Sequence, residues 1–200
     1  MSKLKIGIII GSTRDTRFGE KPARWMLDLA SKREEIEAEL IDLRDYDLPL
    51  FNEVSSNAWQ ESQDPKARAW QKKIGEMDGF IFVTAEYNRS IPGALKNALD
   101  QAYVEWNYKP AAIVGYGSVG GARAVEHLRS ISVELYMVPV RSTVHISGTE
   151  FFTVWHGGGD QPMTAIEGTI GQSAQELLDQ LIWWAELTKT GRAAKAKKSA

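Results

Sequence analysis

Residues 4–19 read Leu-Lys-Ile-Gly-Ile-Ile-Ile-Gly-Ser-Thr-Arg-Asp-Thr-Arg-Phe-Gly, and this stretch decides the fold. It opens with an apolar, β-branched run, which is typical of a parallel strand buried on both faces. The run ends at Gly11 and enters a loop that carries hydroxyl groups and the arginines Arg14 and Arg17. Such a loop between a strand and a helix suits a phosphate, because it offers backbone N–H groups, guanidinium groups and the positive end of a helix. An ordinary turn in which Ser12 or Thr13 caps the helix fits equally well, so the loop alone leaves both interpretations open.

The composition is that of an ordinary globular domain. The chain has 200 residues, of which 43% are hydrophobic and 25% charged, with a formal net charge of −2. That charge argues against a general nucleic-acid binder, which usually presents a strongly basic face. The chain has no cysteine, which excludes disulfides and thiolate chemistry and is consistent with a cytoplasmic protein. The start of the chain runs directly into the first strand, and no apolar run reaches the roughly 20 residues of a membrane span, so we expect neither a signal peptide nor a membrane anchor.

Strand and helix patterns alternate along the chain. The predicted strands are residues 3–11, 37–43, 79–84, 110–115 and 134–140, and the predicted helices are residues 18–31, 92–103, 121–132 and 173–188, with a further helix that starts at Asp64-Pro65. Five strand–helix units predict one α/β domain over residues 1–190, a doubly wound five-stranded parallel sheet with helices on both faces. The basic segment 191–200 is expected to be a frayed, disordered tail.

The loop after the third predicted strand, residues 84–91, contains both turn-forming residues and residues that suit a ligand. Ser90 and Pro92 are explained as the start of a helix, with Ser90 as the N-cap. That interpretation does not explain the adjacent Tyr87 and Asn88 directly after a buried strand. An aromatic ring beside amide donors suits a flat heteroaromatic ligand.

The loop after the fourth predicted strand, residues 115–121, is rich in glycine and formally matches G-x-G-x-x-G. The dinucleotide fingerprint belongs on the first strand–helix unit, with its acidic residue at the end of the next strand, whereas Glu134 precedes its strand here. A simpler interpretation is that the glycines let the backbone approach a planar ring.

Three blocks together carry a family resemblance: Gly11–Arg14, Glu86–Asp100 and Gly117–Gly121. In this order and spacing they resemble the NADPH-dependent FMN reductase family of flavodoxin-like proteins, over about residues 3–140. The middle block, Glu-Tyr-Asn-Arg-Ser-Ile-Pro-Gly-Ala-Leu-Lys-Asn-Ala-Leu-Asp, is the specific one. The resemblance implies a flavodoxin-like sheet of strand order 2-1-3-4-5 that binds FMN.

The resemblance implies that the first loop holds the FMN phosphate and that the other two border the isoalloxazine ring. The implied cofactor-binding residues are Gly11, Ser12, Thr13, Arg14, Arg17, Phe18, Gly19, Glu86, Tyr87, Asn88, Arg89, Ser118, Gly120 and Gly121. The chain departs from the family at Glu86, where relatives often have proline, and at residues 17–19, where they often have a Ser-Asn pair. Arg17 is expected to supply charge to the phosphate in place of that pair.

The implied activity is hydride transfer from NAD(P)H to FMN, followed by two-electron delivery to an acceptor such as a quinone, an azo compound or a free flavin. The flavin carries this chemistry, so no side chain needs to act as a nucleophile. No metal site is expected, because His127, His145 and His156 are scattered.

Two aromatic residues, Trp106 and Trp155, are predicted to lie near the flavin and the acceptor. Packing in the core or at a dimer interface is the alternative for each ring. Because related proteins dimerise near the flavin, a homodimer or homotetramer is also expected.

Two other functions remain open at this stage. One is a flavodoxin-type electron carrier, although its phosphate loop is usually rich in Ser and Thr. The other is a dehydrogenase that binds NAD at Gly115–Gly120. The sequence does not separate NADPH from NADH, because Arg14, Arg17 and Arg89 suit either a 2′-phosphate or FMN.

Overall fold

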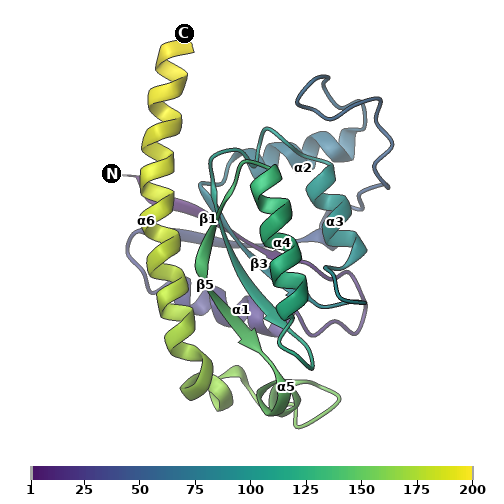
Figure 1. The fold of residues 1–200 in the computed structure, drawn as a ribbon, viewed down its shortest axis with the longest axis vertical. Helices are drawn as coiled ribbons and strands as arrows, with labels where there is room; N and C mark the ends of the chain where they lie inside the picture. Colours follow the sequence, from purple (N-terminus) through teal and green to yellow (C-terminus); the bar gives the residue numbers. More distant parts are fainter. Residues whose placement is uncertain (1, 200) are drawn as a thin grey trace.

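A computed structural model describes residues 2–199 (Figure 1). Its centre is a five-stranded parallel sheet of order β2-β1-β3-β4-β5, which confirms the predicted topology. The strands are β1 (Leu4–Ile10), β2 (Ile36–Asp42), β3 (Gly79–Ala85), β4 (Pro110–Tyr116) and β5 (Val138–Ile146).

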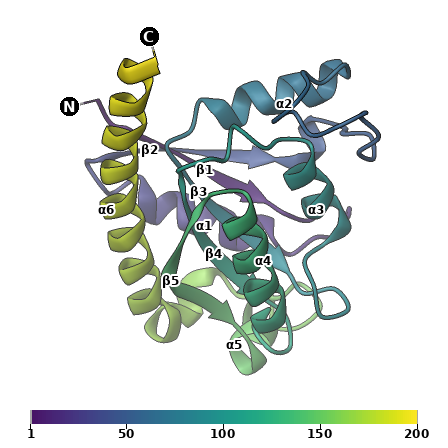
Figure 2. The ribbon, with the colours of Figure 1, turned by 45° about the horizontal axis from the view of Figure 1, so that its top comes forward.

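Helices cover both faces of this sheet. They are α1 (Glu20–Ala30), α2 (Pro65–Gly75), α3 (Gly93–Asp100), α4 (Ala122–Glu134), α5 (Gly148–Val154) and α6 (Glu167–Ser199), with short 3-10 turns η1 (Leu43–Asp45) and η2 (Met163–Ile166). Helices α1 and α6 pack on one face, and α2, α3 and α4 pack on the other (Figures 1 and 2). Within residues 2–199, no helix is long and apolar enough to cross a membrane.

The core forms two layers because side chains alternate along each strand. Ile6, Ile8 and Ile10 of β1 face α1 and α6, whereas Ile9 faces the other layer. The same alternation places Phe80 and Phe82 of β3 beneath α2 and α3. Burial on both faces explains why these strands are apolar throughout.

The last strand lies later in the chain than predicted. The prediction was 134–140, but β5 spans Val138–Ile146. Residue 134 is the last residue of α4, and Tyr136 adopts a left-handed φ of 53°, which ends the helix in a turn. The helix α5 after β5 was not predicted from the sequence.

The basic C-terminal segment is helical, which corrects the expected disordered tail. Helix α6 continues to Ser199, while Ala200 lies outside the described residues. Alanine and lysine are strong helix formers, and they fill residues 193–198. Arg192 also anchors the helix, since its guanidinium donates to Asp78 at 2.8 Å and to the carbonyl of Tyr108 at 2.7 Å.

A buried lysine lies near this anchor. The Lys109 ammonium donates to the carbonyls of Ile74 and Gly75 at the end of α2, at 2.8 and 3.2 Å. Burial, and then the nearby charge of Arg192, lower the pKa of Lys109 from 10.5 to about 8. The folded chain therefore releases this proton at a lower pH than the unfolded chain.

Lys109 is expected to make the free energy of unfolding rise with pH between about 8 and 10.5, since the unfolded chain binds a proton there that the folded chain has lost. One such group contributes at most about 1.4 kcal/mol per pH unit. Urea denaturation of the wild type and of Lys109→Met, from about pH 7 to about pH 10, checks this. The stability difference between the two proteins should grow in favour of the wild type as pH rises, and a pH-independent difference would contradict the expectation.

Candidate functional site

The candidate site lies at the carboxyl edge of the sheet, where the strand order reverses between β1 and β3. The loops after β1, β3 and β4 meet there, as the sequence predicts, because these parallel strands are neighbours in the sheet. A hydrogen bond of 3.0 Å between the hydroxyls of Ser12 and Tyr87 joins the first two loops. Ser12 is buried, so this contact is part of the fold.

The first loop presents a row of backbone N–H groups. Gly11 N–H donates to Val83 O at 2.9 Å, and Arg17 N–H donates to Arg14 O at 3.2 Å. Among the described residues, the N–H groups of residues 12–16 have no hydrogen-bond acceptor. Arg14 is exposed beside them, and its guanidinium donates to Thr16 Oγ1 at 3.4 Å. Free N–H groups beside an accessible guanidinium form a site for an anion.

Arg17 differs from its predicted role. Its side chain is 4% exposed, and its guanidinium forms ion pairs with Asp42 and Glu20. It also donates to the carbonyl of Ser12 at 3.2 Å. The hydrogen bonds that Arg17 donates to the Asp42 carboxylate raise the pKa of Arg17 above its ordinary value despite burial. These carboxylates neutralise the charge that the sequence assigned to a phosphate.

The second loop contains a tight turn at Asn88-Arg89. Both residues adopt left-handed φ angles, 50° and 72°, and the N–H and C=O groups of Tyr87 and Ser90 pair across the turn at 2.8 and 3.0 Å. Two consecutive left-handed residues are the signature of a type I′ turn. This turn exposes Asn88 and Arg89 and leaves Tyr87 half-buried against the core.

The start of α3 also differs from the prediction. The N-cap is Pro92, and Ser90 makes no cap hydrogen bond. The Ser90 hydroxyl instead forms a 2.7 Å hydrogen bond with His127 Nδ1 of α4, so His127 holds the second loop.

Glu86 is directed to the start of α4. Its carboxylate accepts the backbone N–H of Arg123 at 3.1 Å and pairs with the Arg123 guanidinium. The Glu86 side chain is 7% exposed. A carboxylate is stabilised at a helix N-terminus, so this residue ties the second loop to the helix that follows the third.

The third loop depends on glycine. Gly120 and Gly121 have φ angles of 65° and 66°, and a Cβ at Gly121 would lie 2.9 Å from the backbone nitrogen of Tyr116. His145 Nδ1 donates to the Gly120 carbonyl at 2.8 Å and holds the loop from β5. Ser118 is exposed at the tip. Gly120 and Gly121 are themselves buried, so they fix the path of the backbone beneath the exposed tip at Ser118 and Val119.

Aromatic side chains line a cavity of about 190 Å³ between these loops and α5. Phe18 packs edge-on against Tyr116 and Phe151, with ring centroids 5.1 and 5.3 Å apart. Phe151 stacks on Trp155 at 5.6 Å. Arg14 and Tyr87 also contribute to the lining. Sequence reasoning found Phe18, Trp155 and the aromatic segment that contains Phe151, but it did not single out Tyr116, because Tyr116 ends a buried strand.

Trp106 does not belong to this site, which corrects its predicted placement. Its side chain is 0% exposed, and its ring centroid lies 4.8 Å from that of Phe80 and 6.0 Å from that of Trp70. The indole N–H donates to the carbonyl of Leu99 at 3.2 Å. Trp106 is a core residue of the layer beneath α2 and α3.

Gly19 provides a test of the packing under the first loop. Its φ of −55° suits any residue, but a Cβ there would lie 2.7 Å from the Tyr116 hydroxyl oxygen. We expect Gly19→Ala to lower the free energy of unfolding by about 1–3 kcal/mol through overpacking. In a double-mutant cycle, Tyr116→Phe should remove part of this cost, because it deletes the oxygen that clashes. Additive effects in chemical denaturation would contradict this account.

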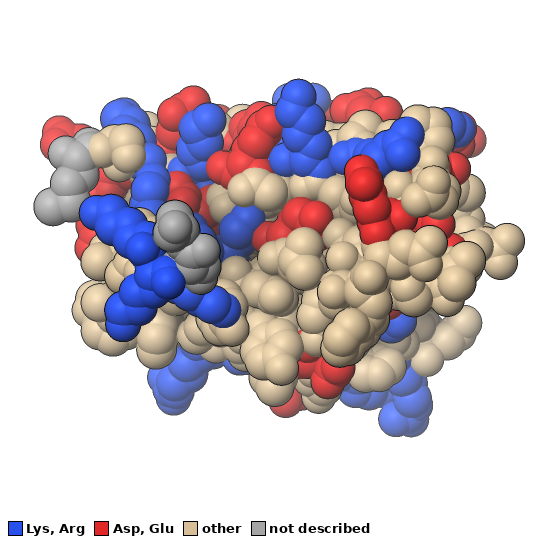
Figure 3. Space-filling view, turned by 90° about the horizontal axis from the view of Figure 1, so that it is seen from above, with Lys and Arg blue, Asp and Glu red and all other residues tan. Residues whose placement is uncertain are grey.

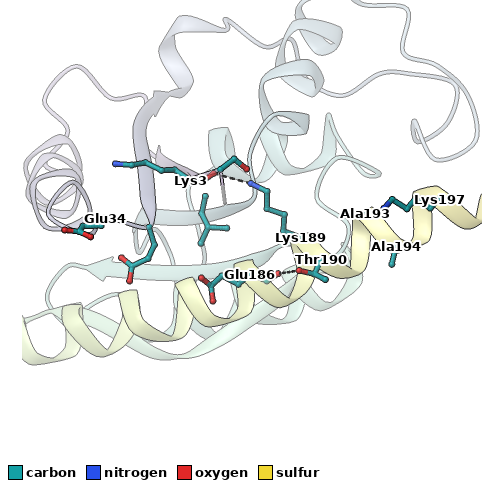
Figure 4. Close-up of a pocket in the computed structure, with 11 residues that line it drawn as sticks. Lys3, Glu34, Glu186, Lys189, Thr190, Ala193, Ala194 and Lys197 are labelled. Carbon is teal, nitrogen blue, oxygen red and sulfur yellow. Dashed lines mark hydrogen bonds between the residues drawn. The ribbon is translucent and has the colours of Figure 1, made fainter.

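A larger cavity, of about 770 Å³, lies far from these loops, between α6 and the start of β1 (Figure 4). Its wall carries Glu34, Glu186 and Lys197, and Lys189 crosses it to donate to the carbonyl of Lys3 at 3.2 Å. The end of the molecule seen from above mixes acidic and basic side chains along one rim and gathers basic side chains on the left of the view (Figure 3). The free N–H groups of residues 12–16 and the aromatic wall both lie at the carboxyl edge, away from this cavity.

Comparison with known proteins agrees with this geometry. A family model for NADPH-dependent FMN reductase matches residues 4–150. The chain is 32% identical over 191 residues to an NAD(P)H-dependent FMN reductase of Nectria sp, covering 92% of this chain and 89% of that one. It is 37% identical over 142 residues to a 2-hydroxy-1,4-benzoquinone reductase of Burkholderia sp, covering 68% and 73%. A solved flavoenzyme NAD(P)H:(acceptor) oxidoreductase from Paracoccus denitrificans matches with a TM-score of 0.68 and 26% identity, over 92% of this chain and 98% of that one.

Proposed function

Because the chain belongs to the NADPH-dependent FMN reductase family, we propose that its three carboxyl-edge loops hold FMN and expose the flavin to NAD(P)H and to an electron acceptor. The protein is an oxidoreductase with FMN as cofactor and NAD(P)H as electron donor, and its acceptors are of the quinone or flavin class. The observation that carries the placement of FMN is the row of free N–H groups at residues 12–16 beside Arg14. A dianionic phosphate group satisfies these donors.

Each loop has a distinct part in this proposal. The first loop binds the phosphate through its N–H groups and Arg14. Tyr87 and Asn88 border one edge of the flavin ring, while the backbone at Gly120 and Gly121 approaches the other edge. Two of the residues implied by the family resemblance have other tasks here, because Arg17 and Glu86 are committed to Asp42 and Arg123.

FMN, when bound, supplies the hydride-accepting and electron-donating chemistry. The chain supplies position and a dry environment. Burial, and then the neighbouring Tyr87, raise the pKa of Tyr116 above its ordinary value, so its hydroxyl stays neutral in the wall of the cavity. Phe151 and Trp155 exclude water from the same side, and Trp155 is the aromatic residue that we place beside the substrate.

The oligomeric state forms a second part of the proposal. Leu50, Val54 and Trp59 are 82%, 88% and 87% exposed in the connection between η1 and α2. Exposed large apolar side chains on one segment favour a protein partner. We infer a homodimer or homotetramer that buries this segment in a cytoplasmic enzyme. Sedimentation of the wild type and of Trp59→Ser tests the assembly, and cell fractionation tests the location.

The test of the function is a visible spectrum of the purified protein before and after anaerobic addition of NADPH. We expect a flavin band that NADPH bleaches and that a quinone restores. A flavin that NADPH does not bleach at a useful rate would favour an electron carrier. A colourless protein that FMN does not reconstitute would contradict the proposal and favour an NAD-dependent dehydrogenase.

A further inference from the structure

Three consecutive carbonyl groups of the first loop are bound by guanidinium groups. Arg17 Nη1 donates to Ser12 O at 3.2 Å. Arg44 of η1 donates through Nε to Thr13 O at 3.3 Å and through Nη2 to Arg14 O. The backbone N–H groups of the same three residues have no acceptor among residues 2–199.

Asp42 joins the two arginines. It is the last residue of β2, and its carboxylate receives both terminal nitrogens of Arg17, with 2.6 Å from Nη1 to Oδ1. Oδ1 also accepts the backbone N–H of Arg44 at 3.0 Å, so Asp42 caps the turn that carries Arg44. Burial alone raises the pKa of Asp42, but the hydrogen bonds and charges of Arg17 and Arg44 hold it below its ordinary value.

We propose that Arg17, Asp42 and Arg44 form a clamp that shapes the first loop for the phosphate of FMN without touching that phosphate. In a trans peptide unit the C=O group and the N–H group of the next residue point in opposite directions, so the bound carbonyls of residues 12–14 turn the N–H groups of residues 13–15 away from the guanidinium groups. The clamp therefore turns a row of donors toward the site before any ligand arrives. Because the loop is already ordered in the folded protein, FMN binding does not have to include the entropic cost of ordering it. The proposal rests on the proposed function, because it names what prepares the phosphate subsite.

The contacts of Arg17 and Arg44 indicate that these arginines hold the loop and do not bind the phosphate themselves. Arg17 directs Nη1 and Nη2 to Asp42, Ser12 O and Glu20, and its side chain is 4% exposed. Arg44 is exposed, yet its guanidinium lies on the carbonyl side of the loop. Arg17 Nε is buried and has no partner among the described residues, whereas Arg14 is exposed and donates to Thr16 Oγ1. Arg17, Asp42 and Arg44 are thus positioning residues.

The experiment compares FMN with riboflavin, which lacks the phosphate. Fluorescence titration of the full chain gives both dissociation constants for the wild type and for Asp42→Asn, which keeps shape but loses charge. We expect Asp42→Asn to weaken FMN binding about 10-fold or more, as loss of charge-assisted hydrogen bonds implies. Riboflavin binding should change less than about 2-fold. The matched control is Asp45→Asn, the same change at an exposed residue of the same turn.

Arginine variants distinguish positioning from charge. Lysine keeps the charge of Arg17 but cannot bridge Asp42 and Ser12 O as a planar fork does. Arg17→Lys should therefore lose FMN affinity as Asp42→Asn does, and retention of affinity would overturn the clamp. If Asp42→Asn does not fold, Arg44→Ala replaces it in the same titration, because Arg44 is exposed and its loss should not unfold the protein. Arg44→Ala should also weaken FMN binding more than riboflavin binding.

The remaining outcomes are also decisive. Equal losses for FMN and riboflavin would reduce the three residues to a general structural role. Tighter FMN binding by Asp42→Asn would identify Arg17 and Arg44 as restrained phosphate ligands and overturn the clamp. A wild type that binds neither flavin would contradict the proposed function itself, whereas a normal FMN preference in Asp42→Asn would overturn the clamp alone.

Discussion

Replacing Trp106 with alanine is expected to lower the free energy of unfolding by about 3–5 kcal/mol, the usual cost of removing a large buried aromatic side chain. Trp106 is fully buried against Phe80 and Phe82. Its loss leaves a cavity that the surrounding β-sheet and helices cannot close. It also removes the donor to the Leu99 carbonyl, which is left without that partner.

Urea denaturation followed by circular dichroism measures this effect. The control is Trp183→Ala, because Trp183 is 55% exposed on α6 and its loss should cost less than about 1 kcal/mol. The milder variant Trp106→Phe should keep both the FMN affinity and the quenching of flavin fluorescence. Loss of quenching in Trp106→Phe with unchanged stability would contradict this assignment and place Trp106 near the flavin.

Replacing Arg14 with alanine is expected to weaken FMN binding about 10- to 100-fold, the scale of a charge-assisted contact with phosphate. Arg14 is the exposed guanidinium beside the free N–H groups of residues 12–16. Its removal leaves those N–H donors in place, so FMN binding should weaken without being abolished. Riboflavin affinity should not change.

Salt provides an independent readout for Arg14. The affinity of the wild type for FMN should fall with ionic strength, because the contact is partly exposed, and the affinity of Arg14→Ala should fall less steeply. Arg24→Ala is the control, since Arg24 is an exposed arginine of α1 that pairs with Glu20. Equal salt dependence in the wild type and Arg14→Ala would place the phosphate elsewhere.

The fold was predictable because its information is local. The apolar runs of β1, β3 and β4 mark strands buried on both faces, and the strand–helix alternation leaves few topologies. The predicted start of a helix at Asp64-Pro65 was also correct, since Asp64 is its N-cap and its side chain accepts from the N–H groups of Lys66 and Ala67. The errors fell at β5 and at the C-terminus of α6, where a turn at Tyr136 and a distant ion pair with Asp78 decide the boundaries.

The candidate site was also predicted in part from local sequence. The residue types of three loops, and their places after parallel strands, predicted an edge that suits a phosphate and a flat ring. The sequence did not reveal that Arg17 pairs with Asp42, a residue 25 positions away, because that contact exists only after β1 and β2 pair. It also did not separate Trp106 from Trp155, since both lie in similar aromatic segments.

By itself, then, the sequence determined the parallel sheet, because hydrophobic periodicity and turn chemistry act over short stretches of chain. The strand order and the family followed from the resemblance of three sequence blocks to a known family. The tertiary structure alone decided which charges remain available to a ligand. Of two arginines three residues apart in one loop, Arg14 is exposed beside the free N–H groups, while Arg17 is neutralised by Asp42. Whether a charge is compensated depends on its distance from opposite charges in the folded structure, and a local sequence pattern does not specify those distances.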